Sequence, residues 1–393
     1  MRILAVCDLG CTSGFATVAR NVLGGLVKKY GHEVHCLAIN YDGDPHPDQQ
    51  FATLYPAHTG GDSVGIGRIG NLAQQIKPDV IWLLSDIQVH ELWLKALNNK
   101  YRTLCYSPID SKDFHASVFN CFDKDNVTLI TYTQFGYDQI KKVKPNLDVK
   151  IISHGIDTNI FYPITPEEKT LLRKSFGIPD DLFIFLNVNR NQLRKNIPAT
   201  MRAFASIKNR LENPALYMHM VWNESPPRGA GWNIQQLAEM YGIEDKMMKT
   251  YLENVRGEKI NMTLKDSVTP SVLADIYRLS DVFVTTTFGE GFGLTLAESQ
   301  ACGVPVIAPD CSAIPELIRG QGMLAKIDSY ITMHYGTRFA IVNEHDVAKK
   351  MMRLATDDKL RKELGSAAAE WGKKNTWEPL VDQWNDLIMG SMA

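Results

Sequence analysis

Two glutamates flank a glycine-rich turn in the second half of the chain. Glu290 and Glu298 stand eight positions apart within TTTFGEGFGLTLAESQACGVPVIAPD, residues 285–310. The apolar run before the turn predicts a strand, and the small residues after Gly293 predict a helix. Glu290 then lies in the turn, and Glu298 about two turns along a helix whose neighbouring small residues indicate a buried face. Because a buried carboxylate without a partner is destabilising, we expect a ligand or a cation to meet Glu298.

This pair of carboxylates could hold the two ends of one elongated ligand. The glycines of the turn leave the backbone amides of Phe292, Gly293 and Leu294 open to an anion. A carboxylate on the adjoining helix can accept both hydroxyls of a ribose, as acidic residues do in dinucleotide sites. We therefore expect a sugar at Glu290 and a nucleoside at Glu298.

A cationic loop is the second candidate. The segment NVNRNQLRKN places Arg190, Arg194 and Lys195 at the carboxyl end of a predicted strand, on the sheet edge where ligands bind in such folds. Three cations there suit a diphosphate, because the negative charge that develops on a leaving group needs fixed positive partners. Arg194 alone is explained as simply by a solvated loop, whereas Arg190 and Lys195 together favour a ligand.

Two loops in the first half supply further candidates. In DLGCTSGFATVARN a glycine-containing turn ends on Gly14 and opens a helix, whose N-terminal amides could approach an anion. In YSPIDSKDFH, after the fourth predicted strand, Asp110 or alternatively His115 would face an acceptor. Either residue could equally be an ordinary turn residue, because aspartate is common in turns.

Two other motifs carry no weight. Residues 65–70 match G-x-G-x-x-G, but that fingerprint must follow directly on a strand, and here HTGGDSV precedes it. Asp42 and Asp44 match the D-x-D with which some sugar transferases hold a metal. They lie in YDGDPHPD, where a solvated turn is the simpler explanation. We therefore predict neither a metal site nor a bound cofactor.

The elements that must position these residues alternate along the whole chain. Almost continuously apolar strands separated by helices predict parallel sheets covered on both faces. Strands are expected at 2–8, 33–40, 79–85, 102–109, 127–133 and 149–155, and again at 182–189, 216–223, 248–253, 281–287 and 304–310. The pattern breaks in a proline-containing stretch, so we predict two doubly wound Rossmann-like α/β domains, 1–162 and 163–375, facing a cleft. Residues 376–393 form an amphipathic helix that returns to the first domain, with its tryptophans packed across the domain junction.

Composition excludes several classes of protein. The 393 residues carry 42 basic and 44 acidic side chains, a net charge of -2, so no global attraction to nucleic acid or anionic lipid is expected. A local basic patch would still allow peripheral membrane contact. Seven scattered cysteines fit free thiols in a reducing compartment. The start reads as a strand rather than a signal peptide, and no apolar run approaches the ~20 residues of a membrane span, so a cytoplasmic protein is expected.

The chain resembles retaining glycosyltransferases of the GT-B fold, in particular family 4, which contains many lipopolysaccharide, sucrose and phosphatidylinositol glycosyltransferases. EGFGLTLAE looks like their E-x7-E motif, with ACGVPV following, and residues 190–195 match their R-x3-R-K loop. SHGIDTNIF is similar to their N-G-V-D…F segment, with His154 in place of asparagine. The terminal TW and its helix match their closing helix. Ile109-Asp110 stands where many members carry His-Asp, which leaves the histidine contact with the donor sugar open.

The resemblance implies transfer of a sugar from a nucleotide diphosphate donor, UDP- or GDP-linked, with retention of configuration and no obligatory metal. A front-face reaction is implied, in which the leaving phosphate oxygen accepts the acceptor's proton. The implied catalytic residues are Glu290, Arg190, Lys195 and Asp110, and the implied donor-binding residues are Gly14, Arg194, Phe292, Gly293, Leu294 and Glu298. Glu290 would hold the sugar hydroxyls and support an oxocarbenium-like state.

Other functions stay open at this point. A nucleotide-sugar epimerase or hydrolase could use the same nucleotide cleft, and a non-catalytic nucleotide-sugar binding protein could use the same fold. The E-x7-E block favours sugar transfer over an epimerase or hydrolase. A non-catalytic binding protein is disfavoured by the joint presence of Glu290, Arg190, Lys195 and Glu298. The acceptor is unassigned among a glycan, a lipid, a protein or a modified nucleic-acid base. No stable nucleic-acid partner is predicted, and the oligomeric state is open.

Overall fold

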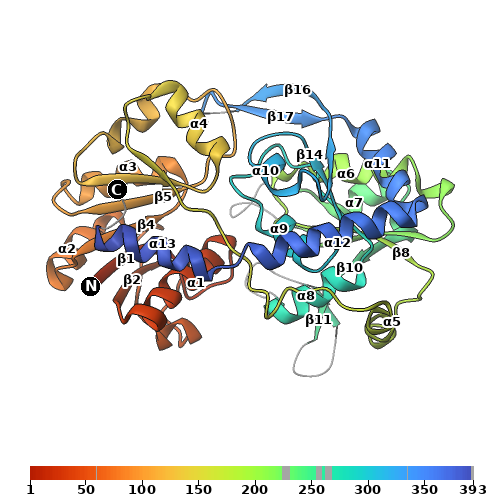
Figure 1. Ribbon diagram of the computed structural model, residues 1–393, viewed down its shortest axis with the longest axis horizontal. Coiled ribbons are helices and arrows are strands. Elements are labelled where there is room, and N and C mark those ends of the chain that lie inside the picture. The colour runs from red at the N-terminus through yellow and green to blue at the C-terminus, as the bar shows by residue number, and fades with distance from the viewer. Residues whose placement is uncertain (59, 224–230, 254–258, 262–267, 334, 391–393) are drawn as a thin grey trace. The chain divides into compact units, whose positions relative to one another are not determined.

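The computed structural model of the chain describes all residues except 59, 224–230, 254–258, 262–267, 334 and 391–393 (Figure 1). The contacts divide the chain into two compact units. Unit 1 comprises Met1–Gly155 and Thr376–Ala393, and unit 2 comprises Ile156–Asn375. None of the described helices is both long and apolar enough to span a bilayer.

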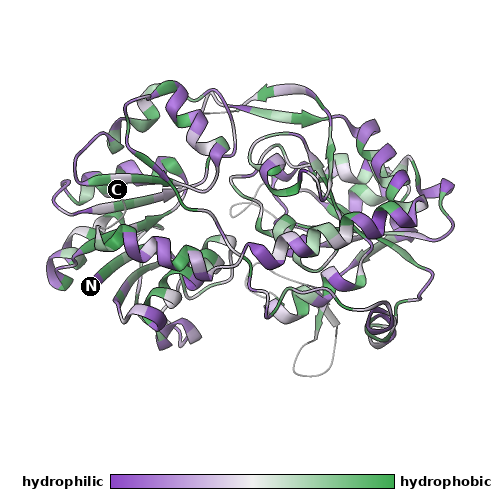
Figure 2. Cartoon of the chain, in the orientation of Figure 1, coloured by the Kyte–Doolittle hydropathy of each residue, from purple (hydrophilic) through white to green (hydrophobic). Residues whose placement is uncertain are grey.

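Unit 1 is built on a seven-stranded parallel sheet with the order β3-β2-β1-β4-β5-β6-β7. Its strands are mainly hydrophobic in Figure 2, as expected for a sheet covered on both faces. The elements are β1 (Arg2–Asp8), α1 (Gly14–Tyr30), β2 (Glu33–Ile39), η1 (Pro47–Gln50), β3 (Ala52–Pro56), α2 (Ile66–Ile76), β4 (Val80–Leu84), α3 (Ile87–Ala96), β5 (Thr103–Ser107), η2 (Ala116–Phe122), β6 (Val127–Thr131), α4 (Gln134–Val143), β7 (Val149–Ile151) and α13 (Glu378–Met389).

Helices cover both faces of this sheet. The helices α2, α3 and α4 bury one set of alternating strand residues in a common core. The terminal helix α13 packs against α1. Its Trp384 is fully buried, with its ring centroid 5.7 Å from that of Trp82 and 4.8 Å from that of Tyr106. The expectation that this tryptophan packs across a domain junction is therefore wrong, because its ring partners lie on β4 and β5 within unit 1.

Unit 2 is built on a six-stranded parallel sheet with the order β10-β9-β8-β13-β14-β15. Two short antiparallel hairpins, β11–β12 and β16–β17, lie outside it. The elements are α5 (Pro166–Ser175), β8 (Phe183–Val188), η3 (Leu193–Lys195), α6 (Ile197–Ala205), η4 (Lys208–Arg210), β9 (Pro214–His219), α7 (Ile234–Met240), η5 (Glu244–Lys246), β10 (Met247–Lys249), β11 (Tyr251–Glu253), β12 (Lys259–Asn261), α8 (Pro270–Leu279), β13 (Val282–Val284), α9 (Leu294–Ala301), β14 (Val306–Pro309), α10 (Ile314–Ile318), β15 (Met323–Ala325), β16 (Ile327–Thr332), β17 (Arg338–Val342), α11 (Glu344–Thr356) and α12 (Asp358–Lys374).

The predicted α/β fold class is confirmed, because each unit holds a doubly wound parallel sheet. One predicted strand, 248–253, is wrong as a single element. Thr250 separates β10 from β11, and its hydroxyl lies 2.6 Å from Nδ1 of His219 and 3.0 Å from the hydroxyl of Tyr217. β10 pairs with β9, whereas β11 pairs antiparallel with β12.

Candidate active site

A ladder of buried asparagines fixes the loop that follows β8. The side-chain amide of Asn187 donates to the carbonyl of Val284 at 2.8 Å, and that of Asn189 donates to Oδ1 of Asn187 at 2.8 Å. Asn191 is fully buried and donates to the carbonyl of Trp232 at 2.7 Å. Buried amides of this kind are stabilising only when their hydrogen bonds are made. The start of the cationic loop is therefore held rigidly at the carboxyl edge of the sheet.

Two of the three predicted cations meet the first glutamate of the motif. Nζ of Lys195 donates to Oε1 of Glu290 at 2.6 Å. Nη1 of Arg194 lies 3.5 Å from Oε2 of Glu290 and donates to the carbonyl of Gly289 at 2.9 Å. The amide of Glu290 donates in turn to the hydroxyl of Ser312 at 2.9 Å. The sequence separates these residues by 95 positions, and the fold joins them into one cluster.

The electrostatics of this cluster favour an ionised carboxylate at Glu290. Glu290 is 6% exposed and Lys195 9%. Burial alone would raise the pKa of Glu290, but the charges of Lys195 and Arg194 and the Lys195 hydrogen bond outweigh it, so this pKa lies below its ordinary value. Two cations, Lys195 and Arg194, thus meet the carboxylate of Glu290. Cationic side chains gathered in this way attract anions.

The glycine-rich turn ends where α9 begins. Gly293 is the residue before the helix and has a φ of 105°, a left-handed conformation that favours glycine. Its carbonyl accepts from the amides of Leu296 and Ala297. The first amides of a helix have no acceptor within it, so the amide of Leu294 is one of those that a ligand can reach. Phe292, just before the turn ends, is buried.

Glu298 lies on the buried side of α9, as predicted, but its described partner is a phenol. The hydroxyl of Tyr277, on α8, donates to Oε2 of Glu298 at 2.9 Å. Burial raises the pKa of Glu298 to about 7, although the Tyr277 hydrogen bond acts in the opposite direction. We expected a ligand or a cation to meet Glu298. The structure adds a hydrogen bond from a tyrosine hydroxyl, which the sequence did not lead us to expect. Only the apolar spacing of residues 271–280 hinted that Tyr277 would face inward.

The remaining predicted residues lie in loops and at helix ends of the two units. Arg190 is exposed, two positions beyond the end of β8. In unit 1, Gly14 is the first residue of α1, and Ser13 caps that helix. Asp110 is half-buried in the loop after β5. His115 is exposed and caps η2, with its Nδ1 accepting from the amide of Ser117 at 3.3 Å.

The two motifs set aside in the sequence occupy ordinary structural positions. Gly65, with a φ of 76°, precedes α2, and the nearest preceding strand, β3, ends at Pro56. Asp42 and Asp44 are exposed. Within the part of the chain that the structure describes, no group of three or more His, Cys, Asp or Glu side chains could hold a metal ion.

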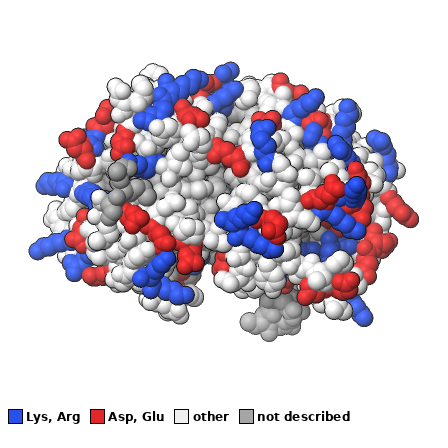
Figure 3. Space-filling view, viewed as in Figure 1, with Lys and Arg blue, Asp and Glu red and all other residues white. Residues whose placement is uncertain are grey.

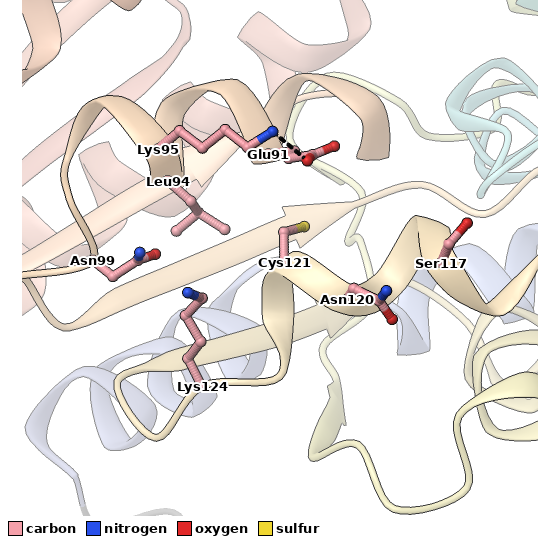
Figure 4. Close-up of a pocket in the computed structure, with 8 residues that line it drawn as sticks. All are labelled: Glu91, Leu94, Lys95, Asn99, Ser117, Asn120, Cys121 and Lys124. Carbon is pink, nitrogen blue, oxygen red and sulfur yellow. Dashed lines mark ion pairs between the residues drawn. The ribbon is translucent and has the colours of Figure 1, made fainter.

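Unit 1 has a pocket of about 500 Å³ whose lining includes none of the predicted site residues (Figure 4). It lies between α3 and η2, and its lining includes Lys95, Lys124 and Cys121. Lys95 is already paired with Glu91 at 2.6 Å. On the face shown in Figure 3, basic and acidic side chains are interspersed over the surface, as the near-zero net charge suggests.

Comparisons with known proteins agree with this architecture. The family description "Glycosyl transferases group 1" matches residues 168–371. D-inositol 3-phosphate glycosyltransferase of Streptomyces bingchenggensis is 28% identical over 249 residues, which cover 62% of this chain and 48% of that protein. N-acetyl-alpha-D-glucosaminyl L-malate synthase of Bacillus anthracis is 24% identical over 254 residues, which cover 64% of this chain and 56% of that protein. The chain thus spans about half the length of the first curated relatives it matches.

Solved structures show the same fold at low identity. Sucrose-phosphate synthase from Thermosynechococcus elongatus superposes with a TM-score of 0.78 at 16% identity, over 99% of this chain and 98% of that one. Anabaena Alr3699/HepE, solved in complex with UDP, superposes with a TM-score of 0.70 at 14% identity, over 99% and 100%. These likenesses establish a GT-B fold, and the family match covers more than half of the chain. The chain belongs to the glycosyl transferases group 1 family.

Proposed function

We propose that this protein transfers a sugar from a nucleotide diphosphate donor to an acceptor hydroxyl, with retention of configuration. The observation that carries the proposal is the cluster of buried Lys195 and Glu290 with half-buried Arg194. It stands at the carboxyl edge of the sheet in unit 2, beside the N-terminus of α9. Carboxyl edges of open α/β sheets are where ligands bind. Cationic side chains and a helix N-terminus both favour a diphosphate.

Each charged residue has a distinct role in this proposal. Lys195 and Arg190 stabilise the negative charge that grows on the departing diphosphate, so that no metal ion is required. Glu290 orients Lys195 and accepts hydrogen bonds from the sugar hydroxyls. Glu298 accepts the hydroxyls of the ribose, and Tyr277 holds its carboxylate in place. The leaving phosphate oxygen takes the acceptor's proton, and Asp110 is assigned to the acceptor side.

A UDP-linked donor has the best support among the nucleotides. The structures of the Anabaena protein carry UDP or UDP-glucose in their descriptions, and that protein shares the fold of this chain. The named acceptors of the curated relatives, D-inositol 3-phosphate and L-malate, belong to longer proteins that this chain matches only in part. The acceptor is therefore assigned here only as a hydroxyl compound.

A donor screen tests the proposal. Purified protein is incubated with UDP-, GDP-, ADP- and TDP-sugars, and release of the nucleoside diphosphate and the thermal shift are both measured. Release with one UDP-sugar, increased by an added hydroxyl acceptor, is expected. The stereochemistry of the glycoside formed is then read by NMR, and an inverted product would refute the retaining assignment. A thermal shift without any release would instead indicate a binding protein.

A further inference from the structure

Lys195 lies between two backbone carbonyls that the segment after β13 holds in place. The carbonyl of Arg194 accepts from the amide of Phe288 at 2.8 Å. The carbonyl of Asn196 accepts from the hydroxyl of Thr286 at 2.7 Å. All of these residues belong to unit 2. The backbone on each side of Lys195 is therefore fixed to the segment that leads into the glycine-rich turn.

The backbone of Asn196 is left-handed, with a φ of 46° and a ψ of 43°. A residue other than glycine adopts this conformation at an energetic cost, so the surrounding contacts must maintain it. Asn196 ends η3 and directly precedes α6, and its carbonyl also accepts from the amide of Ala199 at 3.0 Å. Loss of the Thr286 hydrogen bond would allow this turn, and with it the backbone of Lys195, to relax.

A directed chain of buried hydrogen bonds ends at the Asn196 carbonyl. The hydroxyl of Thr200, on α6, lies 2.8 Å from that of Thr286 and 3.4 Å from the side-chain amide nitrogen of Asn187. A carbonyl oxygen only accepts, and an amide nitrogen only donates. The single hydroxyl proton of Thr286 goes to Asn196, so Thr200 donates to Thr286 and accepts from Asn187. The three side chains are fully buried, so the fold fixes the direction of the chain.

We propose that Thr286 and Thr200 are positioning residues for Lys195. They hold the backbone beside it, so that its ammonium group stays directed at Glu290 and at the leaving diphosphate. This inference rests on the proposed function, in which Lys195 stabilises the negative charge that grows on the diphosphate. Lysine is a point charge on a flexible stem, so its direction depends on contacts at both ends. Glu290 fixes the ammonium end at 2.6 Å, and the threonine hydroxyls fix the backbone end.

A misdirected Lys195 would lower the rate rather than the affinity for the donor. Its stabilising effect is largest when the bond to the diphosphate breaks. A displacement of about 1 Å can reduce the rate about 100-fold. Loss of the Thr286 hydroxyl should therefore lower kcat and leave the Kd of the donor near that of the wild type. A purely structural role would lower Tm without this difference between kcat and Kd.

The test compares Thr286→Val, Thr286→Ser and Thr200→Val with the matched control Ser280→Ala in the full-length protein. Valine has nearly the shape of threonine but no hydroxyl, whereas serine keeps the hydroxyl. Ser280 is also buried in unit 2, and its hydroxyl donates to the carbonyl of Ile276 at 2.9 Å, but it precedes β13 instead of following it. The kcat and the Kd are measured with the nucleotide sugar that the wild type turns over, at a temperature well below every Tm.

Thr286→Val should lower kcat by about 10–100-fold, and Thr286→Ser should retain most of the wild-type activity. Thr200→Val leaves the hydrogen bond from Thr286 to Asn196 in place, so its loss of kcat should be smaller. Ser280→Ala should lower Tm and leave kcat unchanged. The positioning role is refuted if Thr286→Val turns over like Ser280→Ala, or if Thr286→Ser is as slow as Thr286→Val. Should Thr286→Val fail to fold, a kcat of Thr200→Val equal to that of Ser280→Ala refutes it.

Failure of the proposed function gives a different result. In that case the wild type releases no nucleoside diphosphate from any donor, and hydrogen exchange of the amides of Lys195 and Asn196 is measured instead. Both amides donate to carbonyls within the same loop at 3.0 Å. Faster exchange of these amides in Thr286→Val than in Ser280→Ala supports the inference that the hydroxyl holds this loop. Equal exchange in the two variants overturns it.

Discussion

Replacement of Glu298 by glutamine should make the protein more stable and bind its donor less well. Burial raises the pKa of this carboxyl from its ordinary 4.5 to about 7. At 1.36 kcal/mol for each pKa unit, this rise corresponds to about 3 kcal/mol of destabilisation once the group is ionised. The pKa of Glu298 is higher in the folded state than in the unfolded chain. The contribution of the protonated carboxyl to stability is therefore fully present below pH 4.5 and is lost as the pH rises through about 7.

The expected result of Glu298→Gln is therefore dependent on pH. At pH 8 the variant should be more stable than the wild type by about 3 kcal/mol, because the amide carries no charge to bury. At pH 4 the two should be nearly equal, since the wild-type carboxyl is then protonated. Urea unfolding followed by fluorescence at both pH values measures the difference. The matched control is Glu363→Gln on α12, where the side chain is 61% exposed. Its free energy of unfolding should equal that of the wild type at both pH values.

In Glu298→Gln the affinity for the donor should decrease, although the free energy of unfolding increases. A carboxylate can accept two ribose hydroxyls through charge-assisted hydrogen bonds of about 1.5–3 kcal/mol each, which an amide cannot reproduce. Affinity for an intact nucleotide sugar should therefore fall in Glu298→Gln. Wild-type affinity should weaken as the pH drops below about 7, and the variant should show no such dependence. A stabilised variant with unchanged donor affinity would refute the ribose assignment. Absence of any stabilisation at pH 8 would refute the reasoning from burial.

Four further results are expected. Lys195→Ala should lower kcat by about 10²–10³-fold while the donor Kd stays within roughly tenfold. Steady-state kinetics and equilibrium binding measure both, and an unchanged kcat would contradict a role of Lys195 in bond breaking. Arg190→Lys keeps the charge but loses the planar fork, so full activity in this variant would contradict a two-oxygen contact with phosphate. Turnover should survive EDTA, and loss of activity that manganese or magnesium restores would disprove metal independence. Burial lowers the pKa of His90 to about 4 and of His154 to about 3, so the unfolded chain takes up protons that the folded one excludes. Glu298 acts in the opposite direction in this window, so the test uses Glu298→Gln. Its free energy of unfolding should decrease from pH 6.5 toward pH 4, which urea titrations across this window would detect.

The sequence predicted well those elements whose residues are buried on both faces. The runs 80–84 and 103–107 are buried throughout, and both form central strands as expected. β3 was not predicted, because its exposed and half-buried residues at 53–56 give no continuous apolar run. The hairpin of β16 and β17 was missed for the same reason, since nearly all of β16 is exposed. Exposed strands lack the pattern on which a prediction from periodicity depends.

For the site, the sequence identified residue types but not their contacts. Glu290 and Lys195 were both predicted, yet they were assigned to different parts of the ligand, because nothing local shows that residues 95 positions apart touch. Tyr277 was missed because its hydroxyl meets Glu298 only after α8 packs against α9. Such contacts follow from packing of distant elements, which composition and spacing do not encode.

The difference in burial between the two cations most important to the proposal implies a division of roles. Lys195 is nearly buried and already fixed by Glu290, so its orientation needs no rearrangement when negative charge develops nearby. A preorganised cation in a site of low polarity stabilises a transition state more than a solvated one does. Arg190 is exposed, so solvent screens its charge more than it screens the charge of Lys195. Lys195 should therefore act mainly on the rate at which the bond to the diphosphate breaks. Arg190 should contribute both to donor affinity and to this rate.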